Sequence, residues 1–148
     1  MTTDTTHAPP NKESVNQIVT DIFAQKSPEI LDSRSDKIRD FVATTINGDV
    51  SKSHVVTRAN LSKDRKGVLI YVLTNLRIIK IEIDSTDMQS QSFPLSKIIS
   101  VSRKTDGDRS EVQVSFENDS FGLRYNQAEA TITDFFQKVD QSRVKVSP

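Results

Sequence analysis

The sequence predicts an α+β fold in which two helices precede about seven short antiparallel strands and a third helix follows them. Two observations predict it. Apolar residues recur at helical spacing before Gly48 and again after Asn126, whereas between Lys52 and Tyr125 they recur at every second position. The chain has 148 residues, the usual size of one domain, so we expect a single core of moderate size.

The first residues are predicted to form a tail and a helix. Residues 1–11 are polar and Thr-rich, with Pro9-Pro10 near their end, which predicts a disordered tail. Between Lys12 and Gln25 the apolar residues recur at i, i+3, i+4, i+7 and i+8, the spacing that lines one face of a helix. These residues are Val15, Ile18, Val19, Ile22 and Phe23.

A second helix is expected to begin at Ser27-Pro28, which supplies an N-cap and a first-turn proline, and to end before Asn47-Gly48. Residues Ser33–Asp36 also resemble a capping box, so a restart inside this segment is the alternative. We therefore expect an N-terminal helical segment at residues 12–47, followed by the main domain at residues 48–142.

Strands are predicted from Lys52 onward because the apolar period changes to two. The first strand runs to about Leu61, and the charged loop Ser62–Lys66 follows it. Val68–Leu73 is apolar on both faces, as a central strand covered twice would be. A tight break at Thr74-Asn75 then leads into a strand with two different faces. One face carries Ile79, Ile81 and Ile83, and the other carries Lys80 and Glu82.

Four further strands complete the predicted set of seven. A weaker strand covers about Gln89–Phe93, and Pro94 marks its end. Asp106-Gly107 predicts a tight hairpin turn after Ile98–Lys104. The last two strands, Glu111–Phe116 and Ser120–Tyr125, alternate in the same way.

The C-terminal helix is predicted to start at Asn126, because Glu129 three residues later completes a capped helix start. Its apolar stripe consists of Ile132, Phe135, Phe136 and Val139, so we expect both phenylalanines to lie in the core. Residues 143–148 are expected to form a flexible tail.

Composition and charge exclude several classes of protein. The chain has 20 basic and 20 acidic residues, so it lacks the basic excess that neutralises phosphates, and no nucleic-acid partner is expected. It has no cysteine, which excludes disulfides and thiolate metal sites. No segment has the apolar length of a signal peptide or a membrane span, so we expect a soluble, cytoplasmic protein.

Three stretches carry a resemblance to a known family. The hairpin LTNLRIIKI contains Thr74, Asn75 and Arg77, the stretch SFPLSKIISV contains Phe93–Leu95 and Ile98, and the last helix contains Phe135-Phe136. Over about residues 48–141 this pattern resembles the bacterial pleckstrin-homology (PH)-like domains, the YokE-type group in particular. The resemblance implies two antiparallel sheets forming a partly open barrel whose end is plugged by the C-terminal helix. The two N-terminal helices lie outside it.

Catalytic and metal-binding patterns are scarce. His7 lies in the tail, and His54 is expected on the solvated face of the first strand, with no second ligand for a zinc site. Asp106, Asp108 and Glu111 resemble a calcium loop in composition but lack its spacing, so they are interpreted as a charged hairpin. No phosphate loop or catalytic motif occurs. We therefore expect no enzyme activity, no metal and no cofactor.

Two binding hypotheses remain. The less favoured one is that the chain binds an anionic membrane surface. PH-like domains imply lipid headgroups held by the loop after the first strand, which here offers Lys63, Arg65 and Lys66, with Arg58 nearby. The neighbouring acidic loops Asp84–Asp87 and Glu117–Asp119 would cancel much of their field.

The preferred hypothesis is an interaction with a protein, a peptide or a second copy of the chain. The strand Ile98–Lys104 is expected at a sheet edge beside the last helix, where an extended segment could add a strand. The residues expected to form this edge are Ile99, Val101 and Arg103.

Overall fold

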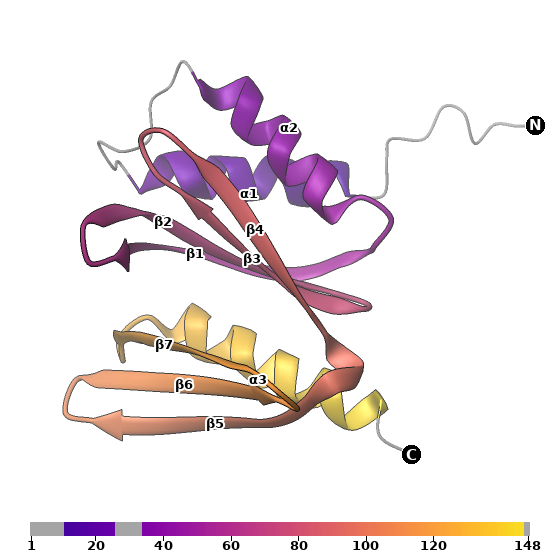
Figure 1. The fold of residues 1–148 in the computed structure, drawn as a ribbon, viewed down its shortest axis with the longest axis vertical. Helices are drawn as coiled ribbons and strands as arrows, with labels where there is room; N and C mark the ends of the chain where they lie inside the picture. Colours follow the sequence, from indigo (N-terminus) through magenta and orange to yellow (C-terminus); the bar gives the residue numbers. More distant parts are fainter. Residues whose placement is uncertain (1–10, 26–33, 147–148) are drawn as a thin grey trace, which may run out of the picture. The chain divides into compact units, whose positions relative to one another are not determined.

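The computed structural model describes residues 11–25 and 34–146 (Figure 1). The expected tail at residues 1–10, the expected N-cap at Ser27-Pro28 and the last two residues lie outside this description. The helices are α1 (Lys12–Ala24), α2 (Ser35–Ile46), the short 3₁₀ helix η3 (Leu95–Lys97) and α3 (Ala130–Val146). The strands are β1 (Ser51–Ser62), β2 (Arg65–Thr74), β3 (Arg77–Ile83), β4 (Met88–Pro94), β5 (Ile98–Asp106), β6 (Arg109–Phe116) and β7 (Ser120–Asn126).

The seven strands form two antiparallel sheets, one in the order β1-β2-β3-β4 and one in the order β5-β6-β7. A four-stranded and a three-stranded antiparallel sheet followed by a C-terminal helix fit the predicted α+β, PH-like fold. The description as a barrel needs correction, because within residues 34–146 no hydrogen-bonded ladder joins the two sheets. Each sheet is open. Pro94 lacks an N–H group and η3 follows it, so the chain leaves the first sheet there.

The described residues divide into two compact units. The first contains the chain up to Asn75 together with Ile79–Gln91, and the second contains Leu76–Ile78 and the chain from Ser92 onward. The first unit therefore holds α1, α2 and most of the four-stranded sheet, and the second holds the three-stranded sheet and α3.

In the first unit, α1 and α2 lie on one face of the four-stranded sheet (Figure 1). The predicted stripe of α1 is buried against the sheet, apart from Phe23, which is partly buried, and α2 begins at the alternative start near Ser35. Each fully buried isoleucine contributes roughly 1.5–3 kcal/mol relative to exposure. The helices therefore share one core with the strands, formed by Ile18, Ile22, Ile38, Val42, Ile46, Val68, Ile70, Val72, Ile79, Ile81 and Ile83 among others.

Strand β2 is buried on both faces, as the sequence predicts for a central strand. Val68, Ile70 and Val72 contact the helices, and the intervening side chains on the opposite face are buried as well. Those side chains are Leu69, Tyr71 and Leu73. Burial, together with the negative charge of Glu82, raises the pKa of the Tyr71 hydroxyl above its usual range.

The turn between β2 and β3 is held by side chains that the sequence singled out. Asn75 exchanges two hydrogen bonds with Val50, because its N–H donates to the carbonyl at 3.0 Å and its Oδ1 accepts from the N–H at 2.9 Å. Thr74 Oγ1 donates to Asp49 Oδ2 at 2.8 Å. In the second unit, Arg77 donates to Ser92 Oγ at 2.8 Å. The hairpin residues of the family resemblance thus have structural partners.

In the second unit, α3 packs on one face of the three-stranded sheet (Figure 1). Phe135 and Phe136 are buried, which confirms their predicted place in the core. Phe136 contacts Phe121, whose ring also lies 4.8 Å from that of Phe93. The helix starts at Ala130, later than predicted, because Asn126 Oδ1 instead accepts a hydrogen bond from the N–H of Ala128 in a turn before it.

The hairpin between β5 and β6 turns one residue later than predicted. Asp106 pairs with Arg109, so Gly107 and Asp108 form the two-residue loop. Gly107 has φ +64°, the left-handed conformation that tight hairpin loops require and that glycine adopts without a steric cost.

Gly67 is predicted to be irreplaceable within β2. A Cβ atom at this position would lie 2.2 Å from the carbonyl oxygen of Ile83 in β3, so the backbone would have to shift. We expect Gly67→Ala to lower the free energy of unfolding by roughly 3 kcal/mol, in the upper part of the range for overpacked sites. Urea denaturation followed by circular dichroism measures it.

The matched control is Gly122→Ala in β7, where the nearest atom to the new Cβ would be 3.5 Å away. We expect this change to alter stability by less than about 0.5 kcal/mol. Equal stabilities of the two variants would contradict the close approach of β2 and β3.

Candidate functional site

The predicted binding edge is the outer strand β5. In the order β5-β6-β7, β5 has a hydrogen-bonded neighbour strand on one side only. Ile99 is 58% exposed, Arg103 is exposed and Val101 is partly buried. The three residues named from the sequence therefore lie on an edge strand, and their role in binding stays a prediction.

A groove of about 200 Å³ runs between β5 and α3. Its apolar part includes Val101, Val112 and Phe136, and its polar residues come from both elements. Tyr125 in β7 fixes the start of α3, because its hydroxyl lies 2.8 Å from Thr133 Oγ1. Arg103 Nη1 also donates to Thr133 Oγ1, over a long 3.4 Å. The groove is lined by Val101, Ser102, Arg103, Val112, Thr133, Phe136, Gln137 and Asp140.

A groove walled by the last helix was predicted beside this strand, but the α3 residues that line it were not. Thr133, Gln137 and Asp140 are four and three residues apart, so they share one face of the helix beside the apolar stripe. That spacing was readable in the sequence. Which strand faces them depends on how α3 crosses the sheet, and no local pattern encodes that.

The basic loop after β1 forms a second hollow, of about 440 Å³. It brings together three of the four predicted cations with the start of the loop after β3. Arg58 is not among them, because it lies within β1, opposite Val68 of β2. The hollow is lined by Lys63, Asp64, Arg65, Lys66, Asp84, Ser85 and Thr86.

Asp84 neutralises this hollow in part. Its carboxylate accepts hydrogen bonds from the N–H groups of Thr86 and Asp87 at 2.9 and 2.7 Å, and from Arg65 Nε at 2.7 Å. Its carbonyl oxygen also accepts a bond from Arg34 beside α2. The Thr86 N–H, followed by Arg65 and the Asp87 N–H, lowers the pKa of Asp84 from 3.8 to about 2, against the opposing effect of burial. The Arg65 guanidinium is thus already paired with the Asp84 carboxylate.

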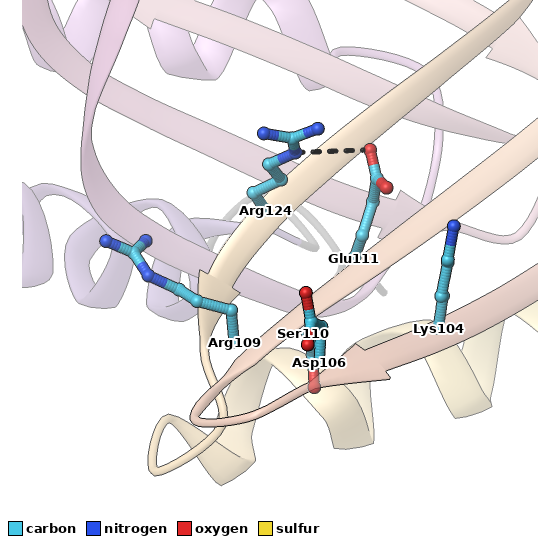
Figure 2. A pocket seen from close by; sticks show the side chains of 6 residues that line it. All are labelled: Lys104, Asp106, Arg109, Ser110, Glu111 and Arg124. Atoms are coloured by element: carbon cyan, nitrogen blue, oxygen red, sulfur yellow. Dashed lines mark ion pairs between the residues drawn. The ribbon is translucent and has the colours of Figure 1, made fainter.

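A third hollow, of about 490 Å³, lies on the face of β5, β6 and β7 that carries the even-numbered residues of β5 (Figure 2). The ladder places Glu111 directly between Lys104 and Arg124, and Arg124 Nε lies 3.5 Å from Glu111 Oε2. In the next row Asp106 stands beside Arg109. Opposite charges alternate in both directions, so this face offsets most of its own field and stabilises the strand register. The sequence pattern did not indicate that these cations lie together.

His54 requires a correction, because the sequence predicted a solvated position. Its side chain is only 16% exposed, and its Nε2 lies 2.8 Å from Asp21 Oδ2 in α1. The error arose because α1 covers the face of β1 that the sequence alone left open to solvent. The described part of the chain contains no cluster of three or more potential metal ligands. None of its described helices combines the length and apolar character needed to span a bilayer.

Comparisons with known proteins add similarities in fold. No protein-family model and no curated protein matches the chain. A DUF1696 family protein with a pleckstrin-homology domain from Shewanella loihica matches 68% of this chain and 95% of its own length, with 14% identity and a TM-score of 0.47. The Vps36 N-terminal PH domain matches 67% of this chain and 82% of its own, with 14% identity and a TM-score of 0.46. The YokE-type group stays a prediction.

Asp84 is predicted to be the main electrostatic contributor to the first unit. We expect Asp84→Asn to lower the free energy of unfolding by about 2 kcal/mol at neutral pH, because the hydrogen bonds to a charged acceptor are weakened. The lowered pKa means that this contribution is complete above about pH 4 and is lost as the pH falls towards 2. Urea titrations at pH 7 and pH 3 measure it.

The control is Asp64→Asn, which removes the same charge from an exposed position in the adjacent loop. It should change stability by less than about 0.5 kcal/mol at either pH. An Asp84→Asn deficit that stays constant down to pH 2 would contradict the role of the charge.

Proposed function

We propose that this chain is a non-catalytic, PH-like interaction module that binds an extended segment of a protein or peptide, or a second copy of itself, along the edge of β5. The observation that supports it is the combination of an edge strand with a partly apolar groove walled by α3. An edge strand exposes backbone N–H and C=O groups that an added strand can pair with. The groove supplies the side-chain contacts that give such pairing its specificity.

The remaining surface supports binding rather than chemistry. Catalysis requires a nucleophile or base held in a pocket by positioned partners. His54 is engaged by Asp21, whose side chain is 38% exposed, and this pair links α1 to β1. The two larger hollows are lined mainly by charged side chains of both signs. The β5 groove combines apolar side chains with an exposed strand edge, as recognition sites for extended peptides do.

The edge can be tested with the full chain by light scattering over a concentration series and by selection from a library of random peptides. We expect association with peptide or with a second copy, and we expect Ile99→Lys and Val101→Pro to abolish it. A proline on an edge strand is tolerated where its missing N–H faces away from the sheet, and thermal unfolding checks that the variant folds.

Leu76→Lys is the matched control, because Leu76 is 59% exposed and Ile99 is 58% exposed, but only Ile99 lies in β5. The control variant should associate as the unmodified chain does. A strictly monomeric protein that enriches no peptide would overturn the proposal, and so would association that survives both β5 variants.

Binding of anionic lipid headgroups at the loop after β1 is the second candidate. Lys63 and Lys66 are both exposed beside the hollow of that loop, which supports it. The pairing of Arg65 with Asp84 weakens it, because a paired guanidinium attracts an added anion less strongly.

Vesicle flotation discriminates between the two candidates. Because Arg65 is engaged, we expect no more flotation with vesicles of neutral and anionic lipid than with neutral vesicles at physiological salt. A salt-sensitive signal that Lys63→Ala/Lys66→Ala removes, and that Lys104→Ala/Lys138→Ala retains, would favour the lipid candidate instead.

A further inference from the structure

The backbone groups that β5 offers to a partner can be assigned from its hairpin. In a two-residue turn, the C=O of the first flanking residue, Asp106, bonds to the N–H of the second, Arg109. Antiparallel ladders alternate between hydrogen-bonded and non-bonded pairs, so every second residue of β5 bonds to β6 and the others point outward. The outward groups belong to Val101, Arg103 and Thr105.

Two of these residues also line the groove. Val101 and Arg103 lie on the face of the three-stranded sheet against which α3 packs, and both belong to the groove lining. A residue of an added strand lies directly opposite its partner, with its side chain on the same face and Cβ atoms about 5 Å apart. The residues opposite Val101 and Arg103 would therefore both enter the groove, and they would be two positions apart.

Val101 and Arg103 bring different chemistry to the groove. Val101 adds an apolar side chain to those of Phe136 and Val112, and Val112 lies directly opposite Arg103 in the ladder. Arg103 makes a long bond to Thr133 and is otherwise exposed, so its fork of N–H donors can still hold a carboxylate. Asp140, the acidic residue of the groove lining, lies seven residues after Thr133 and hence about 10 Å further along α3. The groove is therefore positive beside Arg103.

We infer that the segment that binds along β5 belongs to a partner protein and carries an acidic side chain and an apolar side chain two residues apart. The acidic residue lies opposite Arg103 and the apolar residue opposite Val101. In the antiparallel orientation of the rest of the sheet, the acidic residue comes first in the partner's sequence. This inference rests on the proposed function, and it specifies the chemistry of the occupant.

The β5 strand of a second copy does not meet this requirement. The acidic residue within β5 is Asp106, and its side chain lies on the opposite face of the strand from Arg103. Pairing two β5 strands about Arg103 or about Lys104 would place like charges directly opposite each other, which is destabilising. Pairing about Ser102 would place Arg103 opposite Val101 of the other copy, without a carboxylate.

The test is a selection of random peptides on the full chain and on its Arg103→Glu variant. We expect the unmodified chain to enrich peptides with Asp or Glu two positions from a large apolar residue. The Arg103→Glu variant should enrich Lys or Arg at that position. Replacing the acidic residue of an enriched synthetic peptide by its amide should weaken binding about tenfold or more in fluorescence anisotropy.

Lys104→Glu is the matched control, because it makes the same charge change in the same strand but on the opposite face. It should leave the acidic preference unchanged. Peptides that bind in a Val101-dependent manner but show no acidic preference, or a preference that Arg103→Glu leaves intact, would overturn this inference while the proposed function stands. A library that enriches no peptide on any of these proteins would overturn this inference, and it would overturn the proposed function as well if the chain is also strictly monomeric in light scattering.

Discussion

Burial of both faces of β2 is the constraint on which the first unit depends. Six consecutive apolar side chains, from Val68 to Leu73, alternate between the faces, so neither face can be left to water. At roughly 1.5–3 kcal/mol for each of its three large side chains, leaving one face exposed would remove roughly 5–9 kcal/mol, which is comparable with the whole stability of a small domain. Helices α1 and α2 cover one of these faces and are therefore part of the folded core.

The same constraint limits what the first unit can offer to a ligand. With the helices placed on the sheet, His54 becomes part of a helix-to-strand contact through Asp21. The loops at the end of the sheet are joined by Asp84, which binds the β2 residue Arg65 through its carboxylate and Arg34 through its carbonyl oxygen. Charges that hold the unit together are less available for a partner, so a purely electrostatic mode of binding is weakened.

The second unit differs from the first in which of its groups are available to a partner. Its three-stranded sheet is covered on one face by α3 and carries alternating charges on the other, where Glu111 lies between Lys104 and Arg124. What this unit offers to a partner is the set of backbone N–H and C=O groups of an edge strand, rather than its side-chain charges. β5 joins such an edge to a groove whose lining includes the apolar Phe136 and the cationic Arg103. A segment that pairs with the edge can contact both of these side chains.

The sequence by itself determined the secondary structure and much of the core. Period-two alternation, the continuous apolar run of β2 and the turn residues together located the seven strands, and helical spacing located α1 and the buried Phe135 and Phe136. These signals depend on nearby residues only. It also identified β5 as an edge beside the last helix. Tertiary structure decided what covers each face: the shielding of His54, the engagement of Arg65, the two open sheets, and the α3 residues that wall the groove. Those features depend on which distant segments contact each other. The periodicity of either segment alone does not determine the free energy of such contacts.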